Sequence, residues 1–160
     1  HIMNVELLIK SIIEYKYQIG FVFTGGGTSF LSKLLSIPGA SDFFIEAQIP
    51  YNKKSLELYV GNNLESTCNA VTAVNMANIS YQHIYNTIGK EKLILGISCT
   101  AALKTIRERK GSQRAHVAIY SKNSIFYRYL QFDNNNNREE QESILCDQII
   151  NYIYYCVNSL

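Results

Sequence analysis

The stretch that decides the fold is TGGGTSFLSKLLSIPGAS, residues 24–41, in which three glycines separate an apolar run from a helical pattern. The run FVFT, residues 21–24, predicts a buried strand. Thr28 or Ser29 can cap the following helix, and Pro38-Gly39 ends it. A strand, a glycine turn and a helix in this order are typical of an α/β sheet. Pattern alone leaves the turn as either a tight corner or a phosphate-binding loop.

The flanking sequence extends this unit into one mixed sheet covered by helices. Further helices are expected over residues 4–17, 51–60, 69–88 and 138–158, with Gly20 closing the first. Further strands are expected over residues 43–50, 92–99, 115–121 and 124–132. The last two strands form a hairpin through Lys122-Asn123. The fold class is therefore α/β, with three α/β/α layers and one mixed sheet that includes a C-terminal β-hairpin.

Length and composition suit a single domain. The chain has 160 residues, 47% of them hydrophobic, and a formal net charge of +2. Residues 1–3, His-Ile-Met, resemble a cloning remnant, so we expect one domain over residues 4–160. The small charge indicates no nucleic-acid or membrane partner, and no signal peptide or long apolar span is evident. We therefore expect a cytoplasmic protein.

The four cysteines, of which Cys99 ends a predicted strand, include no C-x-x-C pair, and only three histidines accompany them. This spacing does not indicate a zinc site, so we expect no metal and no cofactor. Buried structural thiols are one interpretation. The other is that Cys99 is a nucleophile, since the end of a strand is a suitable place for one.

Candidate ligand contacts come from three loops that follow predicted strands, because ligands of open α/β sheets gather at the carboxyl ends of strands. The loops cover residues 24–29, 50–54 and 98–114. The candidate ligand-binding residues in or beside them are Gly25, Gly26, Gly27, Thr28, Ser29, Glu46, Tyr51, Ser98, Thr100 and Arg114.

Each of these features has two interpretations. The glycine loop before a helix start can hold an anion or simply turn the chain. The third loop carries Lys104, Arg107, Arg109, Lys110 and Arg114, which suit a phosphate or carboxylate but also a solvated charged loop. His116 is either an acid–base group or a structural imidazole. Alternation places Glu46 on the same side of its strand as Gln48, where the carboxylate either has a polar partner or lies on an exposed face in contact with water.

Several motifs together resemble a known family. They are TGG at residues 24–26, LSKLLSIPGASDFF at 31–44, IPYN at 49–52 and GISCTAAL at 96–103. This series is similar to the CinA C-terminal domain, the nicotinamide-nucleotide amidase family. TGGGTS, SCTAAL and RAHVAI resemble most a divergent Thr-Gly-Gly branch, whose members can be joined to a nucleotidylyltransferase-like domain. The resemblance implies a CinA-like fold and a homo-oligomer, with a dimer as the first expectation.

The resemblance also shows where the chain departs from the family. The amidases use a Ser nucleophile assisted by a Lys, and alignment places Thr24 at the Ser and Leu56 at the Lys. Phe23 stands at the preceding Glu, and Ala101-Ala102-Leu103 replace an Ala-Gly-Pro loop. A Leu cannot take a proton, so the family's Ser/Lys pair is not retained.

Three functions follow from the sequence. The first is a CinA-like domain that binds a small nucleotide-like or phosphorylated ligand without the amidase chemistry. The second is a working amidohydrolase of the nicotinamide-nucleotide amidase type, with Thr24 or Cys99 as nucleophile and His116 as base. The third is an oligomerising or regulatory module without catalysis.

Overall fold

The computed structural model describes residues 4–160, so the expected cloning remnant lies outside the described residues. The elements in chain order are α1 (Val5–Glu14), β1 (Tyr17–Thr24), α2 (Thr28–Leu35), the 3-10 turn η1 (Ala40–Asp42), β2 (Phe44–Gln48), α3 (Lys53–Val60), α4 (Ala70–Ile88), β3 (Leu93–Ala102), β4 (Arg114–Tyr120), β5 (Ile125–Gln131) and α5 (Arg138–Val157). The strands form one sheet in the order β2-β1-β3-β4-β5. β1 runs parallel to β2 and β3, and the β4–β5 hairpin is antiparallel.

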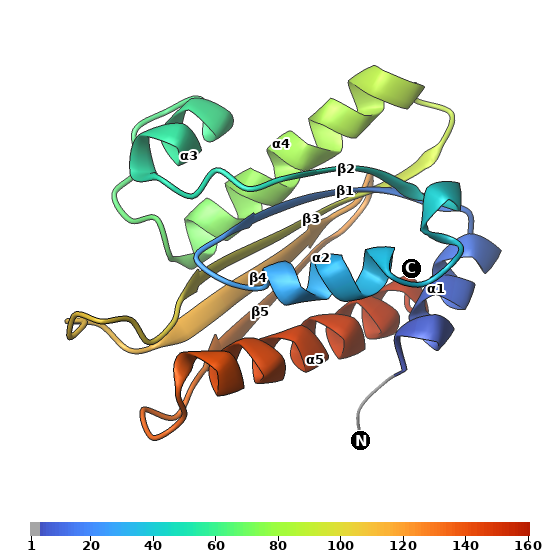
Figure 1. Cartoon of the computed structure of the whole chain (residues 1–160). Coiled ribbons are helices and arrows are strands. Elements are labelled where there is room, and N and C mark those ends of the chain that lie inside the picture. Colours follow the sequence, from blue (N-terminus) through green and yellow to red (C-terminus); the bar gives the residue numbers. More distant parts are fainter. Residues whose placement is uncertain (1–3) are drawn as a thin grey trace.

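Helices cover both faces of this sheet, as expected. α1, α2 and α5 pack on one face, whereas α3 and α4 lie on the other (Figure 1). The alternation of β1 makes both faces apolar, because Phe21 and Phe23 join the core under α2 and α5 while Val22 packs with Leu56 and Met76. The predicted α/β/α layering with a mixed sheet and a C-terminal hairpin is thus confirmed.

Helix α4 approaches the sheet closely over two glycines. A Cβ atom on Gly96 would lie 2.1 Å from the carbonyl oxygen of Ala77. A Cβ atom on Gly20 would lie 2.5 Å from Cγ1 of Ile84. Side chains at these positions would push α4 away, so its small residues and these glycines belong to one packing arrangement.

Two predicted boundaries are wrong. The first helix, expected over residues 4–17, ends at Glu14, and Lys16, with a φ of 63°, turns the chain into β1. Residues 17–20 belong to β1 instead, because β1 pairs with β3 along its whole length. β3 does not end at Cys99 but continues to Ala102, since Thr100 still pairs with His116 of β4. The loop expected from residue 98 therefore begins only after residue 102.

Candidate functional site

The glycine loop is fitted tightly to the end of β3. Gly25 and Gly27 have φ angles of 78° and 94°, in the left-handed region that favours glycine. A Cβ atom on Gly25 would lie 1.8 Å from the Ala101 carbonyl oxygen, and one on Gly26 would lie 2.8 Å from Cδ1 of Leu103. The three glycines thus allow the turn to pack on β3, and only Thr28, at the start of α2, is exposed.

A side chain of the protein occupies the anion position at the start of α2. The Glu142 carboxylate of α5 accepts hydrogen bonds from the backbone N–H of Gly27 at 2.7 Å and of Ser29 at 3.0 Å. The Ser29 hydroxyl donates to the same carboxylate. The free N–H groups and positive dipole end of the helix are therefore already compensated by Glu142.

Four polar residues form a row across the α4 face of the sheet. Thr24 pairs with Thr100, Thr100 with His116, and His116 with Tyr129. Thr24, Thr100 and His116 are buried. The His116 Nδ1 atom lies 2.6 Å from the Tyr127 hydroxyl, whereas its buried Nε2 atom has no hydrogen-bond partner among residues 4–160.

Three of the predicted ligand contacts hold α4 and the segment before it. The Ser98 hydroxyl donates to the Ala73 carbonyl at 2.6 Å, and the Thr100 hydroxyl donates to the Thr67 carbonyl. The Arg114 guanidinium donates to the Cys68 carbonyl at 2.9 Å. These side chains therefore anchor the backbone that covers the polar row.

The predicted catalytic residues do not form a nucleophile–base pair in this arrangement. Cys99 pairs with Val117 and faces α2 and α5, whereas His116 faces α4, so the two lie on opposite faces of the sheet. Thr24 shares the face of His116, but two strand spacings separate them by about 10 Å. Burial raises the pKa of the Cys99 thiol and, with the nearby Arg114 charge, lowers the pKa of His116. Both groups are therefore held in their neutral forms.

Side chains do converge at the exposed rim of this sheet edge. The Arg138 guanidinium, at the start of α5, donates to the Gly25 carbonyl at 3.1 Å and the Lys104 carbonyl at 3.0 Å. It also donates to the Tyr51 hydroxyl at 3.2 Å. Tyr51 is 62% exposed, so its ring stands at the surface beside a cation. Arg138 was not predicted from the sequence, because it belongs to a helix far along the chain rather than to a loop after a strand.

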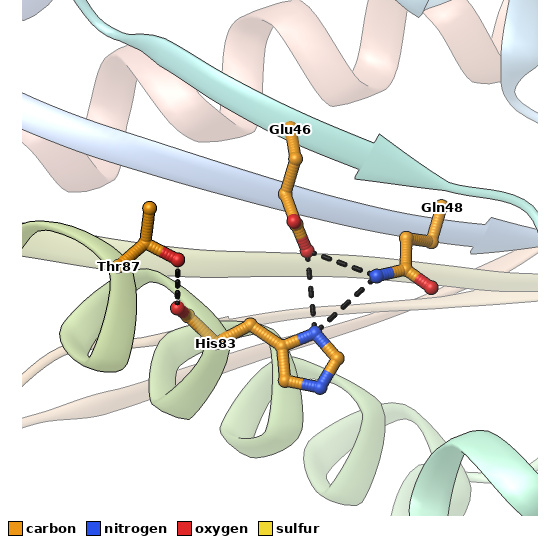
Figure 2. Close-up of polar contacts among 4 residues, drawn as sticks. All are labelled: Glu46, Gln48, His83 and Thr87. Carbon is orange, nitrogen blue, oxygen red and sulfur yellow. Dashed lines mark hydrogen bonds and ion pairs between the residues drawn. The ribbon is translucent and has the colours of Figure 1, made fainter.

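A second polar cluster joins β2 to α4 (Figure 2). The Glu46 Oε2 atom lies 3.2 Å from Nδ1 of His83 and 3.0 Å from Nε2 of Gln48. Glu46 and Gln48 share one side of the strand, as the alternation predicted. When Nε2 of Gln48 and Nδ1 of His83 both donate to Glu46, both are donors. Their separation of 3.3 Å is then a contact between two donors and not a hydrogen bond. The imidazole then keeps Nε2 as an acceptor.

Aromatic packing fixes the His83 ring. The Tyr59 ring of α3 meets it edge-on, with centroids 5.2 Å apart. Burial raises the pKa of Tyr59, and neither its hydroxyl nor that of Ser80 makes a hydrogen bond of good geometry within residues 4–160. His83 was not predicted from the sequence, because only the tertiary structure brings α4 beside β2.

Phe23 and Leu56, which the sequence resemblance predicts at the family's acid and lysine positions, are apolar and structural. Phe23 is fully buried against Phe21 and Phe30. Leu56 is buried between Val22 and Met76. The neighbouring Lys53 and Lys54 are exposed on α3. None of these residues places a proton acceptor beside Thr24.

Within residues 4–160, no three His, Cys, Asp or Glu side chains are grouped so that they could hold a metal ion. No helix in the same range has both the length and the apolar character needed to span a bilayer.

Comparison by sequence found no matching family model and no matching curated protein. Solved structures do match. A competence or damage-inducible protein from Enterobacter asburiae superposes with a TM-score of 0.75 at 11% identity, covering 98% of each chain. The competence/damage inducible protein CihA from Agrobacterium tumefaciens gives 0.73 at 12% identity, over 99% of this chain and 97% of that one. A CinA superfamily protein from Escherichia coli gives 0.71 at 10% identity, over 95% and 87%. These likenesses establish the fold.

Proposed function

We propose, from the CinA-type fold that this chain adopts, that it binds a small nucleotide-like or phosphorylated ligand at the carboxyl edge of its sheet, without the Ser/Lys amidase chemistry. Ligands of open α/β sheets bind at this edge. The observation that carries the proposal is the convergence of Arg138, Tyr51 and the Gly25 turn on the exposed rim. A guanidinium beside an exposed phenol suits a phosphate attached to a planar group.

The contacts to this ligand come from side chains rather than from the start of α2. Glu142 already occupies the backbone donors there, and its negative charge opposes a second anion at the same point. Arg138 and Lys104 lie on the solvent side of the loop, and the Lys104 ammonium donates to the Asn134 carbonyl at 2.7 Å. We therefore place the phosphate near these two cations.

The lack of amidase chemistry is inferred from what surrounds Thr24. Its side chain is 5% exposed, and the aligned acid and lysine positions are the buried Phe23 and Leu56. A hydroxyl nucleophile needs an adjacent base to be activated. Phe23 and Leu56 cannot act as that base, and His116 lies two strand spacings away, so this arrangement favours ligand binding without turnover.

Thermal unfolding with nicotinamide mononucleotide, adenosine monophosphate and the corresponding uncharged nucleosides tests the proposal. A ligand at a hundred times its Kd adds about 2.7 kcal/mol of stability to the protein. We expect stabilisation by the phosphorylated compounds, a loss of it in Arg138→Ala, partial rescue in Arg138→Lys, and no change in Lys53→Ala. Equal stabilisation of Arg138→Ala and wild type would contradict the proposal.

A hydrolase remains a second candidate, because the Glu46–His83 contact orients an imidazole as catalytic dyads do. In that case Nε2 of His83 takes a proton from water as the water oxygen bonds to the amide carbon. The imidazolium then returns a proton to the amide nitrogen, so that the C–N bond breaks and ammonia leaves, with the acid as the other product. Ammonia release from nicotinamide mononucleotide tests this function. Release that is lost in His83→Ala and kept in Gln82→Ala would favour it, whereas no release above a protein-free control excludes it for this substrate.

The third candidate, an oligomerising or regulatory module, stays a prediction, as do the dimer and a nucleotidylyltransferase-like partner domain. Light scattering of the purified chain measures its mass in solution. No stabilisation by any nucleotide together with a dimeric mass would favour this candidate over ligand binding.

A further inference from the structure

A second concave site lies at the opposite edge of the sheet. A cavity of about 480 Å³ opens where β1 and β3 begin, beside the turn of the β4–β5 hairpin. The residues that define its chemistry are Tyr17, Tyr81, Tyr85, Lys90, Lys92 and Lys122. We call it the tyrosine–lysine cavity. Its volume lies within the range of about 300–1,000 Å³ that is usual for small-molecule sites.

The walls of the tyrosine–lysine cavity are aromatic. The rings of Tyr81 and Tyr85 on α4 lie 6.4 Å apart, and Tyr120 of β4 supports Tyr81 at 5.2 Å. Tyr81 is largely buried and therefore fixed, whereas Tyr85 is 36% exposed at the rim. The hydroxyls of the three lining tyrosines make no hydrogen bond within residues 4–160, so they are free to donate to a ligand.

The rim of the cavity is cationic. Lys90 and Lys92 flank it in the turn between α4 and β3, and Lys122 approaches from the hairpin turn. None of the three ammonium groups lies within ion-pair distance of a carboxylate in the described part of the chain. The lining includes no Asp or Glu, since Glu91 of the same turn is not part of it. Leu160 also lines the cavity, and the positive charge of the lysines, which have no ion-pair partner within residues 4–160, faces this aromatic pocket.

We propose that the tyrosine–lysine cavity binds a small organic anion with a planar aromatic part. The ring packs between the tyrosine side chains, whose faces favour offset or edge-on aromatic contacts. The carboxylate or phosphate meets the lysine ammonium groups and accepts hydrogen bonds from the tyrosine hydroxyls. This site is separate from the ligand site proposed above, because it lies at the amino ends of β1 and β3 rather than at their carboxyl ends.

Site-resolved NMR titration separates the two sites. The probes are adenosine monophosphate and benzoate as aromatic anions, with adenosine lacking the charge and inorganic phosphate lacking the ring. We expect the anions to shift the amide signals of residues 90–94 and 121–124, and the two controls to shift them at least tenfold less at equal concentration. Comparing the phosphate with the carboxylate shows which acid group the lysines prefer.

Variants at the tyrosine–lysine cavity and at the Arg138 site, on opposite edges of the sheet, test which of the two sites binds the anion. In the double variant Lys92→Ala, Lys122→Ala, the Kd obtained from the amide shifts of residues 90–94 should rise at least tenfold. In the control Lys53→Ala the same Kd should not change. Tyr85→Leu should weaken it more than Tyr85→Phe, which keeps the ring. Arg138→Ala should change only the shifts of residues 25–29, which report the other site. Unshifted signals at residues 90–94, or an unchanged Kd in the double variant, would overturn this inference without affecting the first proposal.

Discussion

Ser29 and Glu142 are joined twice, since both the backbone N–H and the hydroxyl of Ser29 donate to the Glu142 carboxylate. The two residues lie 113 positions apart in sequence, on α2 and α5. Helices α2 and α5 pack side by side on one face of the sheet, and this contact fixes their relative position at one end. The glycine turn is thus stabilised by a carboxylate of the protein itself.

Replacing Glu142 should destabilise the fold. Glu142→Gln keeps the size of the side chain but places an uncharged amide, a weaker acceptor than the carboxylate, at the start of α2. We therefore expect the free energy of unfolding to fall by about 1–3 kcal/mol. Glu139→Gln is the matched control, since Glu139 is exposed one turn earlier on the same helix. Urea unfolding measures both variants. Equal stability of the two would show that Glu142 has no capping role.

Gly96 should not tolerate a side chain. In Gly96→Ala the new methyl group meets the Ala77 carbonyl and the Tyr81 backbone, neither of which can rotate away, so α4 has to shift. We expect a loss of about 3 kcal/mol or more of unfolding free energy. Gly111→Ala is the control, because its Cβ atom meets only the flexible end of Arg114. A similar unfolding midpoint for both variants would contradict the close packing.

The four thiols should be inert in the folded protein. All are buried, and burial raises the pKa of each, that of Cys156 to about 11. Since the thiolate is the reactive form, a disulfide reagent at about pH 8 should label none of them until the chain unfolds. Labelling by mass spectrometry with and without denaturant measures this. Rapid labelling of Cys99 in the native state would contradict this prediction and would support a role for Cys99 as a nucleophile.

Acid should destabilise the protein partly through His116. Its pKa in the folded state is lowered by burial and by Arg114, whereas the unfolded chain has the ordinary value of about 6.5. As the pH falls from about 7 to about 5, the unfolded state therefore takes up a proton before the native state does, and stability decreases. His116→Gln should show a smaller decrease in urea unfolding over this range. An unchanged decrease would assign the acid sensitivity to other groups.

Local pattern was enough to predict most of the helices and strands. The apolar periodicity of α4, the alternation of β2 and the hairpin before α5 are properties of short segments, and the structure bears them out. Boundaries that depend on pairing were not predictable in this way. β1 and β3 are longer than expected because each is extended by hydrogen bonds to a partner strand, which the local sequence does not specify.

The candidate site shows the same division. The sequence by itself determined the identities of Thr24 and Leu56, and the resemblance predicts that they stand where the family has its Ser and Lys. Only the tertiary structure decided that Cys99 and His116 face opposite sides of the sheet and that Glu142 occupies the start of α2. Such relationships depend on strand register and helix packing between residues far apart in the chain, so no local pattern carries them.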